Sequence, residues 1–216
     1  MFERIKNDKE LIEIYERIND IENKTNAWAH HDYKHVLNVA KLIEQVLSEL
    51  NYSKDLIEEA KIAAILHDVG STTGKDGHAE RSYNYAKDYI DRKNIKLKYK
   101  DDVLEAIRIH SNGFNTNNII ALSLILADKL DITKERVAEY GKQVKGMRQL
   151  LYIEKVDIKI DKNKMEIRFI VNDNINFQEL EEFEFMQKVL KSIDKFSEFH
   201  KLSSKIYLNN TYIIKA

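Results

Sequence analysis

Apolar residues recur three or four positions apart through most of the first 130 residues, and this spacing places them on one face of an α-helix. Residues 5–22, 33–50 and 53–67 each carry such a stripe. Asp32 and Ser53 come just before the second and third stripes and are residue types that cap helix N-termini. The third stripe contains several alanines, which allow close packing, so we expect this helix to be central.

Four more helices are expected in the stretch that ends near residue 151. Their approximate ranges are 77–92, 100–110, 117–130 and 133–151. Asp76 and Thr133 are expected to cap the first and the last of them. Gly70 and Gly113 are expected to permit turns of the backbone after helix ends. Together the stripes predict an all-α bundle of about seven helices.

The pattern changes from a period of 3.6 to a period of 2 after this stretch. Apolar and polar residues alternate in 156–160 and again in 165–171, and the intervening DKNK favours a turn, so a β-hairpin is predicted. The amphipathic stretch 177–201 predicts a helix with Asn176 as its N-cap. A second hairpin is expected around Asn209-Asn210, because asparagine tolerates the positive φ of tight turns.

The predicted fold class is therefore mainly α, with a small C-terminal α+β extension made of two hairpins and one helix. We expect a helical domain over residues 1–151 and the extension over residues 152–216. No repeat and no low-complexity linker separates them, so the extension is expected to pack on the helical domain.

The composition excludes several kinds of chemistry. Without cysteine the chain has no disulfide, thiolate nucleophile or zinc finger, so a metal would be held by imidazole and carboxylate groups. A net charge of −1 gives no strong signal for nucleic-acid binding. The N-terminus lacks the apolar core of a signal peptide, and no stretch approaches the roughly 18 apolar residues of a membrane span. We therefore expect a cytoplasmic protein without membrane association.

Histidines and aspartates stand at the ends of consecutive predicted helices. They are His35, His67, Asp68, His78, His110 and Asp128. A His-Asp dipeptide alone is weak support for a metal site, because His31-Asp32 is a second copy of it. Helix ends in a bundle can converge, however, and these side chains are the ligand types that a cysteine-free site can use. The pattern predicts a metal site at the converging ends.

The same residues resemble the HD-domain superfamily of metal-dependent phosphohydrolases. The matching segments, spread over roughly residues 28–140, are HDYKHVLNVA, AAILHDVG, HAERSYNYA, AIRIHSNG and LILADKLD. The resemblance implies a fixed ligand set, with four core ligands and the two extra histidines of the two-metal subgroup. These are His35, His67, Asp68 and Asp128, then His78 and His110.

Within the superfamily the order of the motifs is most similar to the bacterial HD enzymes that cleave dinucleoside tetraphosphates. It is less similar to the branch that hydrolyses cyclic di-GMP. Two features depart from the wider pattern: Ser71 stands where many relatives have a lysine, and the GYP signature is absent. The chain after about residue 150 lies outside the resemblance.

The implied chemistry is hydrolysis by a metal-activated water. One or two divalent ions would bind, from Fe, Mn, Co, Ni, Zn or Mg, and a bound ion lowers the pKa of its water toward about 7. Asp68, as the metal-bridging carboxylate of the family, would also orient that water. Lys129, next to Asp128, is the candidate catalytic cation.

Four residues are candidates for binding the phosphate of the substrate. They are His31, Arg81, Arg108 and Lys129. Each has a plainer interpretation, since His31 could border the site and the three cations could be solvated surface charges. His78 and His110 could likewise contact phosphate instead of metal. Arg108 lies two residues before His110, a spacing that puts the two on different helix faces.

The predicted function is therefore a phosphohydrolase acting on a nucleotide or another small phosphate ester or anhydride. A di-iron oxygenase on the same six ligands is a second hypothesis. A third is a module that binds a nucleotide or a partner without turnover and uses the extension as its partner surface. The exact substrate, the identity and number of the metal ions, and whether the chain forms a homodimer stay open.

Overall fold

The helical stripes of the first 130 residues fold as expected in a computed structural model that describes residues 1–214. The elements are α1 (Phe2–Lys6), α2 (Lys9–Lys24), α3 (Tyr33–Glu49), α4 (Lys54–Leu66), the 3-10 helix η1 (Val69–Thr73), α5 (His78–Arg92), α6 (Lys100–Ile109) and α7 (Ile119–Leu130). The first predicted helix is interrupted after Lys6, and the carboxylate of Asp8 accepts a hydrogen bond from the backbone N–H of Glu10 at 3.0 Å. Asp8 thereby supplies an acceptor at the start of α2.

The predicted helix caps can be checked one by one. Asp32 accepts from the backbone N–H of His35 at 2.9 Å, and Ser53 accepts from that of Leu56, so both are confirmed as N-caps. The prediction for Asp76 is wrong, because α5 has Gly77 at its N-cap with φ at +67° and no side-chain cap. A left-handed residue there turns the chain sharply into α5, which glycine allows without steric cost.

Helix α4 is the central helix of this part, as predicted. It packs against α1, α3, α5 and α6, and Ala60, Ala63 and Ala64 are completely buried. The small side chains let the neighbouring backbones approach closely. Tyr15 of α2, also fully buried, donates from its hydroxyl to the carbonyl of Ile65 at 2.7 Å. The C-terminal end of α4 is therefore held in the core, just before His67 and Asp68.

Two compact units divide the chain. One contains Met1–Ile21 and His31–Asp128, and the other contains Glu22–His30 and the chain from Lys129 onward. The structural division thus falls at residue 128, whereas the sequence placed the boundary after residue 151. No helix among residues 1–214 is long and apolar enough to cross a membrane.

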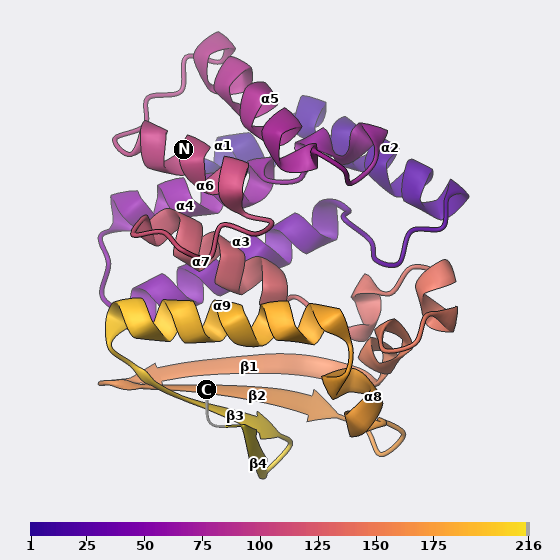
Figure 1. Ribbon diagram of the computed structural model, residues 1–216. Coiled ribbons are helices and arrows are strands. Elements are labelled where there is room, and N and C mark those ends of the chain that lie inside the picture. Colours follow the sequence, from indigo (N-terminus) through magenta and orange to yellow (C-terminus); the bar gives the residue numbers. More distant parts are fainter. Residues whose placement is uncertain (215–216) are drawn as a thin grey trace. The chain divides into compact units, whose positions relative to one another are not determined.

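The second unit holds a four-stranded sheet (Figure 1). Its elements are β1 (Ile153–Asp161), β2 (Lys164–Val171), α8 (Phe177–Glu181), α9 (Glu184–His200), β3 (Ser203–Leu208) and β4 (Thr211–Ile214). Both predicted hairpins are confirmed, and Asn209 adopts the expected positive φ of 50°. They join through parallel pairing of β2 with β3, and α9 lies along one face of the sheet. The predicted single helix is two, because the chain breaks at Glu182-Phe183.

The helix predicted over residues 133–151 is wrong. The chain forms short 3-10 helices, which are η2 (Lys134–Arg136), η3 (Tyr140–Gln143) and η4 (Met147–Tyr152). Gly146 has φ at +80°, outside the helical region. Gly141 lies so close to the chain at Trp28 that a Cβ would come 2.1 Å from the carbonyl oxygen of Trp28. Contacts with a distant segment therefore override the local apolar spacing.

Glu59 of α4 anchors the segment that leads into α6. Its side chain is 3% exposed, and its two carboxylate oxygens accept from the backbone N–H groups of Lys98 and Tyr99, each at 2.7 Å. Hydrogen bonds to a buried charged acceptor are stronger than neutral ones. Glu59 therefore fixes where α6 begins.

Replacing Glu59 by Gln should lower the free energy of unfolding by roughly 1–3 kcal/mol, because an amide NH₂ would face a backbone donor and leave it without an acceptor. Urea unfolding followed by circular dichroism measures this. Glu58→Gln is the matched control, since Glu58 is partly exposed and pairs with the N-terminal amine, an interaction worth at most about 1 kcal/mol. Equal losses in the two variants would contradict the anchoring role.

Candidate metal centre

The six predicted ligands meet at one place in the first unit. His35 lies in the first turn of α3, His67 at the C-cap of α4, Asp68 directly after it, His78 at the start of α5, His110 at the C-cap of α6 and Asp128 in α7. All are buried except His78, which is partly exposed. Helix ends from distant parts of the sequence thus converge as expected.

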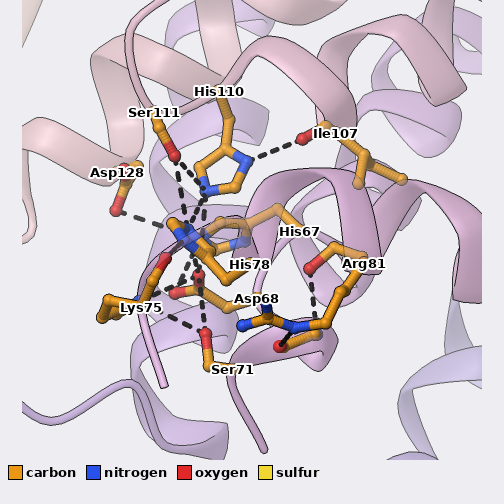
Figure 2. Close-up of polar contacts among 12 residues, drawn as sticks. His67, Asp68, Ser71, Lys75, His78, Arg81, Ile107, His110, Ser111 and Asp128 are labelled. Atoms are coloured by element: carbon orange, nitrogen blue, oxygen red, sulfur yellow. Dashed lines mark hydrogen bonds and ion pairs between the residues drawn. The ribbon is translucent and has the colours of Figure 1, made fainter. Parts of the chain in front are cut away.

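The carboxylate of Asp68 lies at the centre of the cluster (Figure 2). Its Oδ2 is 3.3 Å from Nε2 of His67 and 3.7 Å from Nε2 of His35. Its Oδ1 is 3.2 Å from Nε2 of His78 and 3.7 Å from Nε2 of His110. Each oxygen therefore faces a different pair of imidazoles, which is the arrangement of a carboxylate that bridges two positions.

Asp128 lies beside the two histidines, His35 and His67, that face Oδ2 of Asp68. Its Oδ1 lies 3.3 Å from Nε2 of His35 and 3.9 Å from Nε2 of His67. Ligand atoms of His35, His67 and Asp128 all lie within 4.8 Å of one another, and so do those of His67, Asp68 and His110. The two groups share His67, so they are adjacent.

Backbone carbonyls fix which nitrogen of three histidines faces the cluster. Nδ1 of His67 lies 2.7 Å from the carbonyl oxygen of Ala64, and Nδ1 of His110 lies 2.7 Å from that of Ile107. Nδ1 of His78 lies 2.6 Å from the carbonyl oxygen of Lys75. A carbonyl can only accept, so each Nδ1 carries the proton and each Nε2 presents a lone pair.

The protein does not satisfy all three of these lone pairs. The hydroxyl of Ser111 lies 3.3 Å from Nε2 of His78 and 3.4 Å from Nε2 of His110, but its single proton can serve only one of them. Nε2 of His78 and Nε2 of His110 are 2.9 Å apart, although both are acceptors once Nδ1 holds the proton. Nε2 of His67 is buried and makes no hydrogen bond within residues 1–214. A cation held by the nitrogens and by the central carboxylate resolves both conflicts. The donor set of imidazole and carboxylate fits a divalent metal ion.

The sequence comparison agrees with this geometry. Residues 32–133 match the family described as HD domain, and this range contains all six ligands. The chain contains an HD domain. HD domains bind divalent metals and belong to a superfamily of metal-dependent phosphohydrolases. No curated protein matches the chain.

Electrostatics favour the ionised form of the central carboxylate in the HD domain. Burial opposes the charge of Asp68, but Lys75 and His67 outweigh it and hold the pKa of Asp68 well below its usual range. Burial also disfavours the charged form of His67, yet Asp68 and Asp128 raise the pKa of this histidine. Burial lowers the pKa of His110 to about 4. His110 is therefore neutral and ready to bind metal over most of the pH range.

The sequence did not predict that Lys75 contacts the central carboxylate. Its Nζ lies 3.1 Å from Oδ1 of Asp68 and 3.4 Å from Oγ of Ser71. Ser71 is the position at which many relatives have a lysine, and Lys75 follows it by four residues. Because Ser71 replaces the lysine of many relatives, it was a signal in the sequence that another residue of the loop could supply the positive charge.

Arg81, a candidate for phosphate binding, instead donates hydrogen bonds to backbone carbonyls of the segment that precedes α5. Its Nε donates to the carbonyl of Gly70 at 2.8 Å, and its two terminal nitrogens donate to the carbonyls of Asp76 and Gly74. Arg108 is exposed and lies over the ring of Tyr83 at 5.4 Å. Neither guanidinium is among the groups that meet at Asp68.

The other two candidates for substrate binding occupy different surroundings. The ring of His31 lies 5.9 Å from that of His35 and borders the metal centre. Lys129 is buried, and its Nζ lies 5.9 Å from the ring of Phe185 within the second unit. Contact of either residue with a substrate stays a prediction.

Gly70 serves close packing, which corrects its predicted role as a turn. A Cβ on Gly70 would come 2.5 Å from the carbonyl oxygen of His78 and 2.5 Å from the backbone nitrogen of Ser82. Its own N–H donates to Oγ of Ser82 at 2.9 Å. Gly113 likewise has no room for a Cβ, which would lie 2.7 Å from the carbonyl oxygen of Ile109. The absent side chain of Gly70 lets α5 bring His78 to the centre.

Metal content should separate the two sides of the cluster. His78→Ala should retain the ion held by His35, His67 and Asp128 and lose the other, whereas Asp68→Ala should lose both, because Asp68 faces both sides. Elemental analysis of the purified chain after metal-supplemented expression measures the ratio of metal to protein, and circular dichroism checks that the helices persist. Equal metal content in the two variants would contradict a bridging carboxylate.

The metal-free HD domain should lose stability in mild acid. Because the pKa of folded His110 is about 4 and that of an unfolded histidine is 6.5, the unfolded chain takes up the proton first as the pH falls. From pH 6.5 to 5 this histidine should cost roughly 2 kcal/mol of unfolding free energy. The pKa of His67 is raised in the folded chain, so this histidine stabilises the fold at low pH, and its contribution is lost as the pH rises above 6.5.

Urea unfolding of the chelator-treated chain at pH 7 and pH 5 measures this loss. His110→Gln removes the titrating group, so its stability should depend less on pH than that of the unaltered chain. An identical pH dependence in the two proteins would show that His110 is not held neutral.

Proposed function

We propose that this HD domain hydrolyses phosphate ester or anhydride bonds in a small phosphorylated compound, with a nucleotide as the favoured class, and that it uses two divalent ions. The observation that carries the proposal is the position of Asp68. Its two oxygens face two separate pairs of imidazoles. Two metal positions that share a carboxylate suit in-line displacement at phosphorus.

When bound, the ions supply an activated water and charge stabilisation of the phosphoryl oxygens. The chain contributes the frame that keeps the ligands in place. The carbonyls of Ala64, Lys75 and Ile107 keep the Nδ1 protons on their histidines, so that Nε2 points inward. These hydrogen bonds to backbone carbonyls also fix the orientations of the imidazole rings, so little reorganisation is needed when ions bind.

The charge balance of the centre favours an anionic substrate. Asp68 and Asp128 are the carboxylates among the six ligands, and neutral imidazoles add no charge. Two divalent ions would therefore leave a net positive centre, and the ammonium of Lys75 adds to it. A phosphate or polyphosphate group neutralises this excess, whereas a neutral organic substrate does not.

The choice of metal follows from the number of imidazoles. Four histidines among six ligands favour Fe, Mn, Co, Ni or Zn over Mg, which prefers oxygen ligands and keeps much of its water. The same donors suit a di-iron oxygenase. The cation at Asp68 favours the phosphohydrolase, and the experiment below separates the two activities.

The test is a phosphate-release screen of the full chain loaded separately with Mn, Fe, Co, Ni or Zn. The panel contains nucleoside mono-, di- and triphosphates, dinucleoside polyphosphates, cyclic nucleotides and p-nitrophenyl phosphate. We expect turnover of at least one compound. His67→Ala should lower the rate of this turnover at least 100-fold, because His67 belongs to both groups of ligands. Oxygen consumption is recorded in parallel with the Fe-loaded chain.

Lys96→Ala serves as the control variant, because this exposed lysine lies in the segment between α5 and α6, outside the six-ligand cluster. Metal-loaded protein that hydrolyses no compound of the panel would contradict the proposal. Substrate-dependent oxygen uptake without phosphate release would favour the oxygenase instead.

A further inference from the structure

We propose that Lys75 binds the phosphoryl group of the substrate at the open side of the metal centre. This inference rests on the proposed function and adds to it a specific substrate-binding residue. Lys75 lies outside the matching segments AAILHDVG and HAERSYNYA, in the loop between η1 and α5.

Lys75 lies where solvent reaches the centre. Its side chain is 41% exposed, while its partner Asp68 is 2% exposed. Among the histidines that face Asp68, His78 has the most exposed side chain, at 13%, and it faces the same oxygen, Oδ1, as Lys75 does. An anion that approaches the centre from this side meets the ammonium group before it meets the buried ligands.

The loop is built so that Lys75 faces the centre. Gly74 directly precedes Lys75 and Gly77 follows it by two residues, with φ at +99° and +67°, conformations that other residues rarely adopt. The guanidinium of Arg81 donates to the carbonyls of Gly70, Gly74 and Asp76, and these bonds close the loop. The backbone on both sides of Lys75 is therefore held.

The backbone of Lys75 is also coupled to a ligand. Its carbonyl oxygen lies 2.6 Å from Nδ1 of His78 and 3.1 Å from the backbone nitrogen of the same residue. One residue thus orients His78 through its carbonyl and reaches Asp68 through its ammonium. Any substrate group held by the ammonium is consequently placed at a fixed position relative to His78.

A metal ion on this side would free the ammonium for substrate. Oδ1 of Asp68 is the oxygen closest to both His78 and Lys75, at 3.2 and 3.1 Å. An oxygen that coordinates a divalent ion gives up much of its negative charge to the ion, which weakens its attraction for Lys75. The lysine side chain is a flexible point charge and can then turn to a phosphate oxygen.

The other nearby cations are less suited to this role. The three donating nitrogens of Arg81 are engaged by loop carbonyls. Arg108 lies over the ring of Tyr83 on an exposed helix face. Lys75 is the residue whose cationic group contacts the central carboxylate, within the part of the chain that the structure describes.

The experiment measures phosphate binding without turnover. Inorganic phosphate is titrated calorimetrically into the full Mn-loaded chain, after unbound metal has been removed, and metal content is determined for every variant. Lys75→Met keeps the length of the side chain and removes its charge. Its dissociation constant for phosphate should rise at least tenfold, with metal content equal to that of the unaltered chain or higher. Lys75→Arg should retain most of the affinity.

Lys87→Met is the matched control, because Lys87 is an exposed lysine of the neighbouring helix α5. It should bind phosphate like the unaltered chain. Phosphate affinity within twofold of normal in Lys75→Met would overturn the role of Lys75 while leaving the proposed function intact. Loss of metal from Lys75→Met would also overturn it and would assign the lysine to the metal centre itself. An unaltered chain that holds metal but does not bind phosphate would contradict the proposed function.

Discussion

A carboxylate without solvent exposure is costly unless positive or polarisable groups surround it, and the metal centre of this protein is organised around one such group, Asp68. Imidazoles face both of its oxygens, and the ammonium of Lys75 contacts one of them. The ligands brought together by this group come from α3, α4, α5 and α6. Its ionised state is therefore a property of the assembled bundle, and no single helix could stabilise it.

Helix ends do most of the positioning. His67 and His110 follow the last turns of α4 and α6, where carbonyls lack helical partners, and each imidazole uses such a carbonyl to fix its own proton. The alanines of α4 allow the neighbouring helices to come close enough for these ends to meet. Because each ligand is oriented by its own helix, the inward direction of the lone pairs exists before any ion binds.

The loop between η1 and α5 gives the centre its open side. Gly70 has no room for a side chain beside the first turn of α5, and that contact places His78. Arg81 closes the loop through backbone carbonyls, which leaves Lys75 directed at Asp68. In this segment the guanidinium of Arg81 holds the backbone, and the ammonium of Lys75 faces the central carboxylate.

The amino-acid sequence predicted the helices of the first 130 residues, both hairpins and the candidate ligands of the metal centre, because periodicity and residue type are local properties. Capping is local too, and the predicted N-caps Asp32, Ser53 and Asn176 are confirmed. Tertiary structure alone decided the 3-10 helices that replace the predicted seventh helix, the parallel pairing of β2 with β3, and the roles of Gly70, Arg81 and Lys75. Each of these depends on contacts between segments distant in the chain. Residue type indicated that a cation could lie near the centre, but only the folded loop shows that the ammonium of Lys75 contacts Asp68.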